Sequence, residues 1–169
     1  MIIVSNCITA IRGSVTIMYT KDKTYCPACG AGLIPHGWCE RKLIVSEETK
    51  VFSLRVSYCQ KCCRSHRELP DSIIPYKRHS VEDYAQVYDT QRGKHGCGCV
   101  DEKTARTIKA WVTGFIAFAA IICQNVITGF PKMLNKSDQE ITVQMIKFYV
   151  KIVVNNNFWS FSVPPVKSF

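Results

Sequence analysis

The sequence predicts an α+β protein in which a small β-hairpin module precedes an α-helical region. Two C-x2-C pairs, in TYCPACG and in YCQKCC, enclose β-prone sequence, whereas helical periodicity and capping residues begin only after them. The 169 residues, of which 47% are hydrophobic and 21% charged, suit one modest globular domain or two small modules with a tail. We expect the chain to divide into an N-terminal extension (1–23), the hairpin module (24–68), a connector (69–79), a helix-turn-helix-like helical region (80–130) and a C-terminal helix with an irregular tail (131–169).

The hairpin module is predicted from a strand-like alternation. In KVFSLRVSY, the side chains of Phe52, Leu54, Val56 and Tyr58 alternate with the intervening ones, which is the period-two pattern of a half-buried strand. WCERKLIV is expected to form the partner strand, and the polar SEETK the turn between the two. The runs IIV and VTIMY within the first 23 residues are weakly strand-like and indicate no role.

Helical signals begin at Ser80, a suitable N-cap that is followed three residues later by Asp83, as in a capping box. We expect a first helix over 80–89 and a further helix over 101–115 that is entered through Asp101. The glycine-rich TQRGKHGCGC between them is expected to be a loop.

A second capping box, Ser137 with Glu140, precedes ITVQMIKFYVKIVV, for which we expect a helix. Many residues of this segment are β-branched, so a strand is the alternative. The remainder, NNNFWSFSVPPVKSF, is expected to be irregular.

An uncharged apolar stretch at 110–130 lies between Lys109 and Lys132. Its length is just sufficient for a membrane-spanning helix, which needs ~20 apolar residues. Gln124 and Asn125 interrupt the run, however, and this favours a buried core helix over insertion into a membrane.

The two cysteine pairs predict a zinc ribbon. Each C-x2-C aims two thiolates at one point, and a hairpin between the pairs completes a tetrahedron around Zn²⁺. Gly30, directly after the second cysteine, suits the turn of such a knuckle. The expected metal ligands are Cys26, Cys29, Cys59 and Cys62.

The cysteines also allow other interpretations of which residues bind metal and of what the first pair does. Cys63 or His66 could replace one of the four ligands, and His95, Cys97 and Cys99 could form a second metal site. The CPAC segment also matches a thioredoxin-like redox motif, but GAGLIPHG follows it and no helix is expected to begin there.

The segments CPACGAGLIPHGWCERKL and FSLRVSYCQKCCRSHRELPDSIIPYKRHS together resemble a bacterial family of uncharacterised zinc-ribbon proteins. The architecture is similar to the zinc-ribbon and helix-turn-helix heads of insertion-sequence transposases. The resemblance covers residues 24–82 and resumes loosely at TARTIKAW, which looks like a recognition helix. It implies DNA binding in a mobile-element context and the same four cysteine ligands.

The charge distribution agrees with a nucleic-acid partner. Lys and Arg outnumber Asp and Glu by 22 to 13, for a formal net charge of +9, which favours polyanions. Further basic residues could extend this surface along the ribbon, at Arg41, Lys42, Arg55, Lys61, Arg64 and Arg67. The residues expected to contact duplex DNA are Lys103, Thr104, Arg106, Thr107, Lys109, Lys77 and Arg78.

We expect a non-catalytic protein, because no acidic triad, HExxH motif or phosphate-cradling glycine loop is present. The start of the chain lacks a secretory pattern, so we expect a reducing cytoplasm, where ten cysteines serve metal binding better than disulfides. The alternatives are a protein-interaction adaptor that uses the ribbon and the apolar helix, with a protein partner or a second copy, and a membrane-anchored zinc module.

Overall fold

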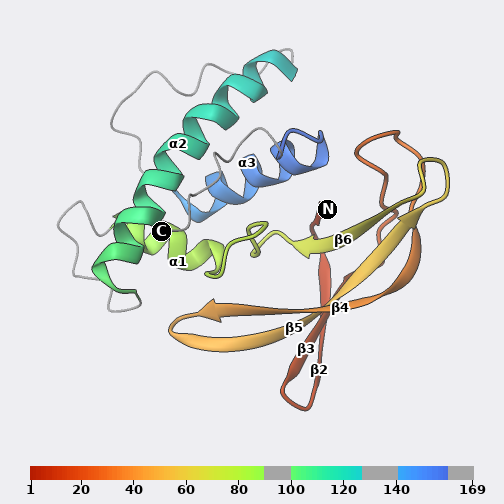
Figure 1. Cartoon of the computed structure of the whole chain (residues 1–169), viewed down its shortest axis with the longest axis horizontal. Coiled ribbons are helices and arrows are strands. Elements are labelled where there is room, and N and C mark those ends of the chain that lie inside the picture. Colours follow the sequence, from red (N-terminus) through yellow and green to blue (C-terminus); the bar gives the residue numbers. More distant parts are fainter. Residues whose placement is uncertain (90–99, 127–140, 160–169) are drawn as a thin grey trace.

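The computed structural model describes residues 1–89, 100–126 and 141–159. Within these ranges a curled, mixed β-sheet lies beside a group of three helices (Figure 1). The prediction of a mixed α+β protein is therefore confirmed. The strands are β1 (Ile2–Val4), β2 (Cys7–Arg12), β3 (Val15–Thr20), β4 (Ile34–Val45), β5 (Glu48–Cys59) and β6 (Arg64–Pro70).

The long strand β5 organises the sheet. One edge of β5 pairs with β4 along almost its whole length, in an antiparallel hairpin. Its other edge is shared, because β3 pairs in parallel with its middle residues and β6 pairs antiparallel with its last residues. The hairpin turns at Ser46 and Glu47, whose φ values of 50° and 73° match the left-handed backbone of a two-residue hairpin turn.

Residues 1–23, expected as an extension, form three strands of the sheet instead. β2 and β3 make a hairpin, and β1 pairs in parallel with β6 at the far edge. The pairing of β1 with β6 joins segments that are distant in sequence, so alternation within the segment alone could not reveal it.

The helices are α1 (Val81–Asp89), α2 (Glu102–Val126) and α3 (Val143–Asn155). The predicted capping box is confirmed at α1, where the Ser80 hydroxyl accepts from the Asp83 amide at 3.1 Å and donates to the Asp83 carboxylate at 2.8 Å. Asp101 caps α2 through a bond from the Thr104 amide at 3.0 Å.

Helix α2 continues through the predicted 101–115 helix into the apolar stretch, up to residue 126. It is long and apolar enough to cross a membrane by length and composition. One side of it nevertheless belongs to the core, where Ile108, Val112, Phe115, Ala119 and Cys123 are buried.

The last helix is confirmed as a helix, and the strand alternative is wrong. It begins at Val143 with Thr142 as the N-cap, whose hydroxyl accepts from the Met145 amide at 3.2 Å. Ser137 and Glu140, the expected capping pair, lie outside the described residues.

One hydrophobic core joins the sheet to the helices. It contains Leu43, Leu54 and Leu69 from the strands, and it continues through Ile73 and Ile74 of the connector into the helices. The cysteine-bearing hairpin therefore shares its core with the helical part of the chain.

Candidate metal centre

Cys26 and Cys29 lie in the loop between β3 and β4, which folds back tightly on itself. The Cys26 amide donates to the Ala31 carbonyl and the Gly30 amide donates to the Cys26 carbonyl, both at 2.8 Å. Gly30 has a φ of 70°, a left-handed conformation that glycine adopts without strain. The turn thus brings the two cysteines of the first pair to one side of the loop.

The second pair comes from the other end of the module. Cys59 is the last residue of β5, and Cys62 lies in the turn that leads into β6. Figure 1 shows this turn and the loop after β3 next to each other, at the end of the sheet away from the β4–β5 turn.

The four sulfur atoms of Cys26, Cys29, Cys59 and Cys62 lie within 4.8 Å of one another. The Sγ atoms of Cys26 and Cys62 are 3.5 Å apart, and those of Cys29 and Cys59 are 3.4 Å apart. Four thiolates at ~2.3 Å from a central Zn²⁺ stand roughly 3.8 Å apart in a tetrahedron. The spacing is therefore that of a tetrathiolate metal site.

The backbone of the second turn favours the thiolate form of Cys59, whereas burial raises the pKa of Cys62. The Cys62 amide hydrogen-bonds to the Cys59 sulfur and lowers the pKa of Cys59 to about 7. An ionised Cys59 is the species that coordinates a metal.

His66 is not one of the four clustered ligands but touches the site. It is buried on β6, and its Nε2 lies 3.4 Å from the Cys26 sulfur. In the tautomer that carries its proton on Nε2, His66 donates a hydrogen bond to that sulfur, as outer partners of metal ligands commonly do.

Cys63 points away from the cluster. It is exposed, has a φ of 55°, and its thiol contacts the Gln60 carbonyl at 3.7 Å. Of the two adjacent cysteines, the structure therefore places Cys62 in the cluster. The expected second site, His95, Cys97 and Cys99, lies outside the described residues.

The residues expected to contact DNA lie mostly on the exposed first turns of α2. Lys103, Arg106 and Thr107 are exposed, and Lys109 is partly buried. Arg106 pairs with Glu102 on the same helix. Thr104 is engaged locally, because its hydroxyl donates to the Asp101 carboxylate at 2.6 Å.

The two other expected contacts come from the connector, close to α2. The Lys77 ammonium sits 4.8 Å from the centre of the Trp111 ring on α2, in a cation–π contact. Arg78 is exposed, and its carbonyl accepts from the Ile44 amide of β4 at 2.7 Å. The connector thus brings its basic residues beside both β4 and α2.

Arg55, which was expected on the basic surface, is instead paired in the interior. Its Nε donates to Glu68 at 2.8 Å, and its Nη2 donates to the Thr20 carbonyl at 2.6 Å. Glu68 also accepts from the Ser57 hydroxyl at 2.6 Å. Sequence reasoning missed this network because its members come from three strands that are adjacent only in the folded sheet.

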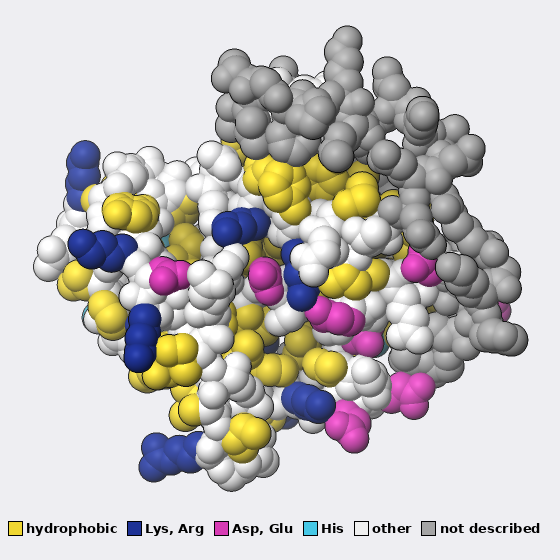
Figure 2. Space-filling view, turned by 180° about the vertical axis from the view of Figure 1, so that it is seen from behind, with side chains coloured by type: hydrophobic (Ala, Val, Ile, Leu, Met, Phe, Trp, Pro, Cys, Tyr) yellow, Lys and Arg dark blue, Asp and Glu magenta, His cyan; other side chains and the backbone are white. Residues whose placement is uncertain are grey.

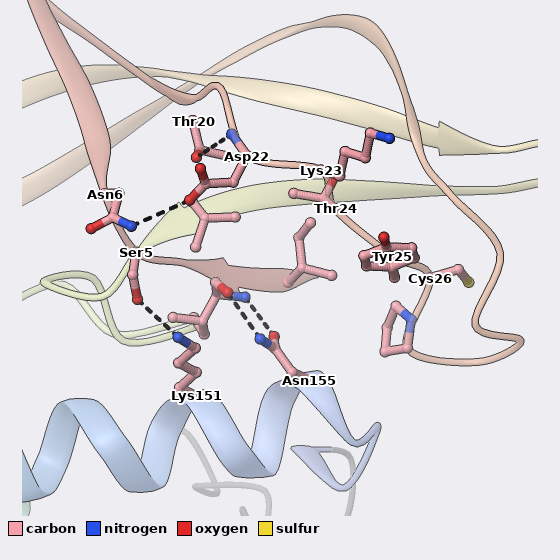
Figure 3. A pocket seen from close by; sticks show the side chains of 14 residues that line it. Ser5, Asn6, Thr20, Asp22, Lys23, Thr24, Tyr25, Cys26, Lys151 and Asn155 are labelled. Atoms are coloured by element: carbon pink, nitrogen blue, oxygen red, sulfur yellow. Dashed lines mark hydrogen bonds between the residues drawn. The ribbon is translucent and has the colours of Figure 1, made fainter.

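A cavity of about 400 Å³ lies beside Cys26, between β1, the loop after β3 and helix α3 (Figure 3). Several of the polar groups that line it form hydrogen bonds. Lys151 donates to Ser5 at 3.0 Å, Asn155 forms two hydrogen bonds with the backbone of Ile3, and Asn6 donates to Asp22 at 3.4 Å. These contacts attach α3 to the first strand.

Residues 26–111 match the family described as Domain of unknown function (DUF6431). The match covers just over half of the chain, so the chain belongs to this family. It begins at the first cysteine of the cluster and ends at Trp111 of α2, and so includes all four clustered cysteines. No curated protein and no solved structure matches the chain.

Proposed function

We propose that the four clustered cysteines bind one Zn²⁺ ion, and that this ion stabilises a non-catalytic, duplex-DNA-binding protein. The main observation in support of a metal is that four sulfurs from two separate turns converge at distances that suit a tetrahedron. Thiolate sulfur and tetrahedral geometry together favour zinc.

The ligand count supports a structural role. Four protein ligands fill the tetrahedron and leave no open position for a reacting water, which catalytic zinc sites retain. A closed site would instead fasten the loop after β3 to the turn between β5 and β6. Its binding free energy would then contribute directly to folding.

The metal proposal is tested by metal analysis of purified protein, with Cys59→Ser compared against Cys63→Ser. Cys59 is buried in the cluster, whereas its near neighbour Cys63 is exposed and outside it. We expect one zinc per chain in the native protein and in Cys63→Ser, and loss of zinc with a large fall in thermal stability in Cys59→Ser. Equal zinc content in the two variants would refute the assignment.

DNA binding is supported by the exposed basic face on the first turns of α2, beside the basic connector. Lys103, Arg106 and Lys109 recur at helical spacing and so share one side of the helix. A net charge of +9 favours the same class of partner. On the face shown in Figure 2, Lys and Arg side chains predominate over the half of the molecule that contains the sheet, so the basic surface is not confined to α2.

A fluorescence-anisotropy titration against labelled duplex DNA tests this proposal. The triple variant Lys103→Ala/Arg106→Ala/Lys109→Ala should weaken binding and lower the salt dependence, because each lost phosphate contact reduces the slope by about one. The matched control is Arg12→Ala, an exposed cation at the end of β2, on the sheet hairpin remote from α2 (Figure 1). Absence of duplex binding at low salt by the zinc-loaded protein would refute the DNA proposal.

A further inference from the structure

A second basic surface lies where β4, β6 and the connector meet. A groove of about 230 Å³ is lined there by five cations, Arg41, Lys42, Arg67, Lys77 and Arg78, and by the aromatic ring of Tyr76. Glu40 is the one acidic residue in its lining. Two of the cations, Lys77 and Arg78, were expected from sequence to meet nucleic acid, whereas the groove itself depends on the fold.

The cations of the groove are held close together without acidic partners. Among the described residues, none of the five forms an ion pair with a carboxylate. Burial, together with the neighbouring charge of Arg67, lowers the pKa of Arg41, and burial lowers the pKa of Lys77. Such an arrangement is electrostatically unfavourable in the free protein and is relieved when an anion binds.

Arg41 is fixed in position by the connector. Its Nη2 donates to the carbonyls of Ile74 at 2.8 Å and Lys77 at 2.6 Å. Because one edge of the guanidinium is engaged in this way, the side chain is already ordered before a ligand arrives. A preorganised guanidinium loses little conformational entropy when it binds a phosphate.

Tyr76 occupies a backbone position that normally takes glycine. The Lys77 amide donates to the Ile74 carbonyl at 3.2 Å, which closes a turn over Ile74-Pro75-Tyr76-Lys77. Tyr76 is the third residue of this turn and has a φ of 60°, as in a type II turn, where glycine or asparagine is usual.

The strained residue contributes little to the core, because 75% of Tyr76 is exposed. Backbone strain of this kind is retained where the surrounding structure enforces it, commonly at binding sites. A large aromatic ring that faces outward, beside a row of cations, is the arrangement with which proteins bind single-stranded nucleic acid: the cations follow the phosphates and the ring stacks on a base.

We propose that this groove binds a segment of single-stranded DNA, with its phosphates on the cations of the groove and one unpaired base stacked on Tyr76. The inference rests on the proposed function and deepens it. In a duplex, both faces of each base are covered by stacking, so an aromatic ring can engage a base face only where the strand is open. The basic face of α2 would then bind duplex DNA, and the groove would bind single-stranded DNA.

The test uses the full-length, zinc-loaded protein and two fluorescent probes, a short oligothymidylate and a mixed-sequence duplex. The decisive variant is Tyr76→Gly, which removes the ring and suits the positive φ, so it should fold at least as well as the native chain. We expect oligothymidylate binding to weaken by roughly tenfold or more, as for loss of one stacked base, with duplex binding unchanged. Tyr76→Phe keeps the ring and should keep the affinity.

The charge contribution is tested with Arg67→Ala, which should weaken oligothymidylate binding and reduce its salt slope, with Arg12→Ala as the control. Duplex binding without oligothymidylate binding, or oligothymidylate binding that Tyr76→Gly leaves unchanged, would overturn the inference alone. An equal loss for both probes in Tyr76→Gly would show that Tyr76 does not distinguish unpaired from paired DNA and would also overturn it. Failure of both probes to bind the native protein would overturn the proposed function as well.

Discussion

The interior ion pair between Arg55 and Glu68 provides a stringent test of the fold. Replacement of Arg55 by methionine keeps an unbranched side chain of similar length but removes the charge. The Glu68 side chain is 0% exposed and that of Arg55 16% exposed, so the change leaves a buried carboxylate without its cation. Removal of one partner of a buried pair costs about 3–5 kcal/mol.

The remaining contacts place the expected loss near the lower end of that range. Glu68 keeps its hydrogen bond from Ser57 at 2.6 Å, whereas the Thr20 carbonyl loses its bond from Arg55. We therefore expect Arg55→Met to lower the free energy of unfolding by about 3 kcal/mol. For a chain of this length, that loss corresponds to a fall in Tm of roughly 6–12 °C.

The assay is thermal and urea-induced unfolding of the zinc-loaded protein, with Glu48→Gln as the matched control. Glu48 pairs with Lys50 at 3.6 Å, but their side chains are 76% and 47% exposed, so the loss there should stay below about 0.5 kcal/mol. The double variant Arg55→Met/Glu68→Met should recover much of the loss. Equal effects of Arg55→Met and Glu48→Gln would refute the buried pair.

Two further predictions concern the first helix and the metal site. Ser80→Ala removes the buried hydroxyl that caps α1 and should lower the free energy of unfolding by about 1–2 kcal/mol. The control Thr113→Ala, at an exposed position within α2, should change it by less than about 0.5 kcal/mol. Chemical denaturation measures both values, and equal effects would contradict the cap. Acid should release the proposed zinc ion: the pKa of Cys59 is lowered to about 7, so its thiolate predominates above that pH and protons compete with the metal below it. A zinc-sensitive dye should report progressive release as the pH falls, and zinc retained in full in strong acid would contradict thiolate ligation.

Local chemical patterns in the sequence predicted part of the structure well. The cysteine pairs are informative because ligand spacing within a turn is fixed over four residues, and the cluster forms as that spacing indicates. The capping box at Ser80 is similarly local, since the hydroxyl and the carboxylate it meets are three residues apart. The turn between β4 and β5 follows from the polar residues that interrupt two alternating segments.

Features that depend on distant pairing could not be predicted in the same way. Nothing in VTIMY indicates that β3 pairs in parallel with β5, because each residue pairs with one 36 positions further along. The period-two pattern places Arg55 on the solvent side of its strand, whereas in the structure it bonds to Thr20 and Glu68 from two other strands. The left-handed backbone at Tyr76 also could not be predicted, because a positive φ at this turn position is normally inferred from a glycine in the sequence.

The paired hydrogen bonds between Asn155 and Ile3 have a consequence for self-association. β1 is the outermost strand on its side of the sheet, and its unpaired backbone groups would otherwise offer a template to another chain. The Asn155 side chain accepts from the Ile3 amide at 2.8 Å and donates to the Ile3 carbonyl at 2.9 Å, as a neighbouring strand would. A single carboxamide at the end of α3 therefore occupies the place of an invading strand and protects this edge against edge-to-edge aggregation.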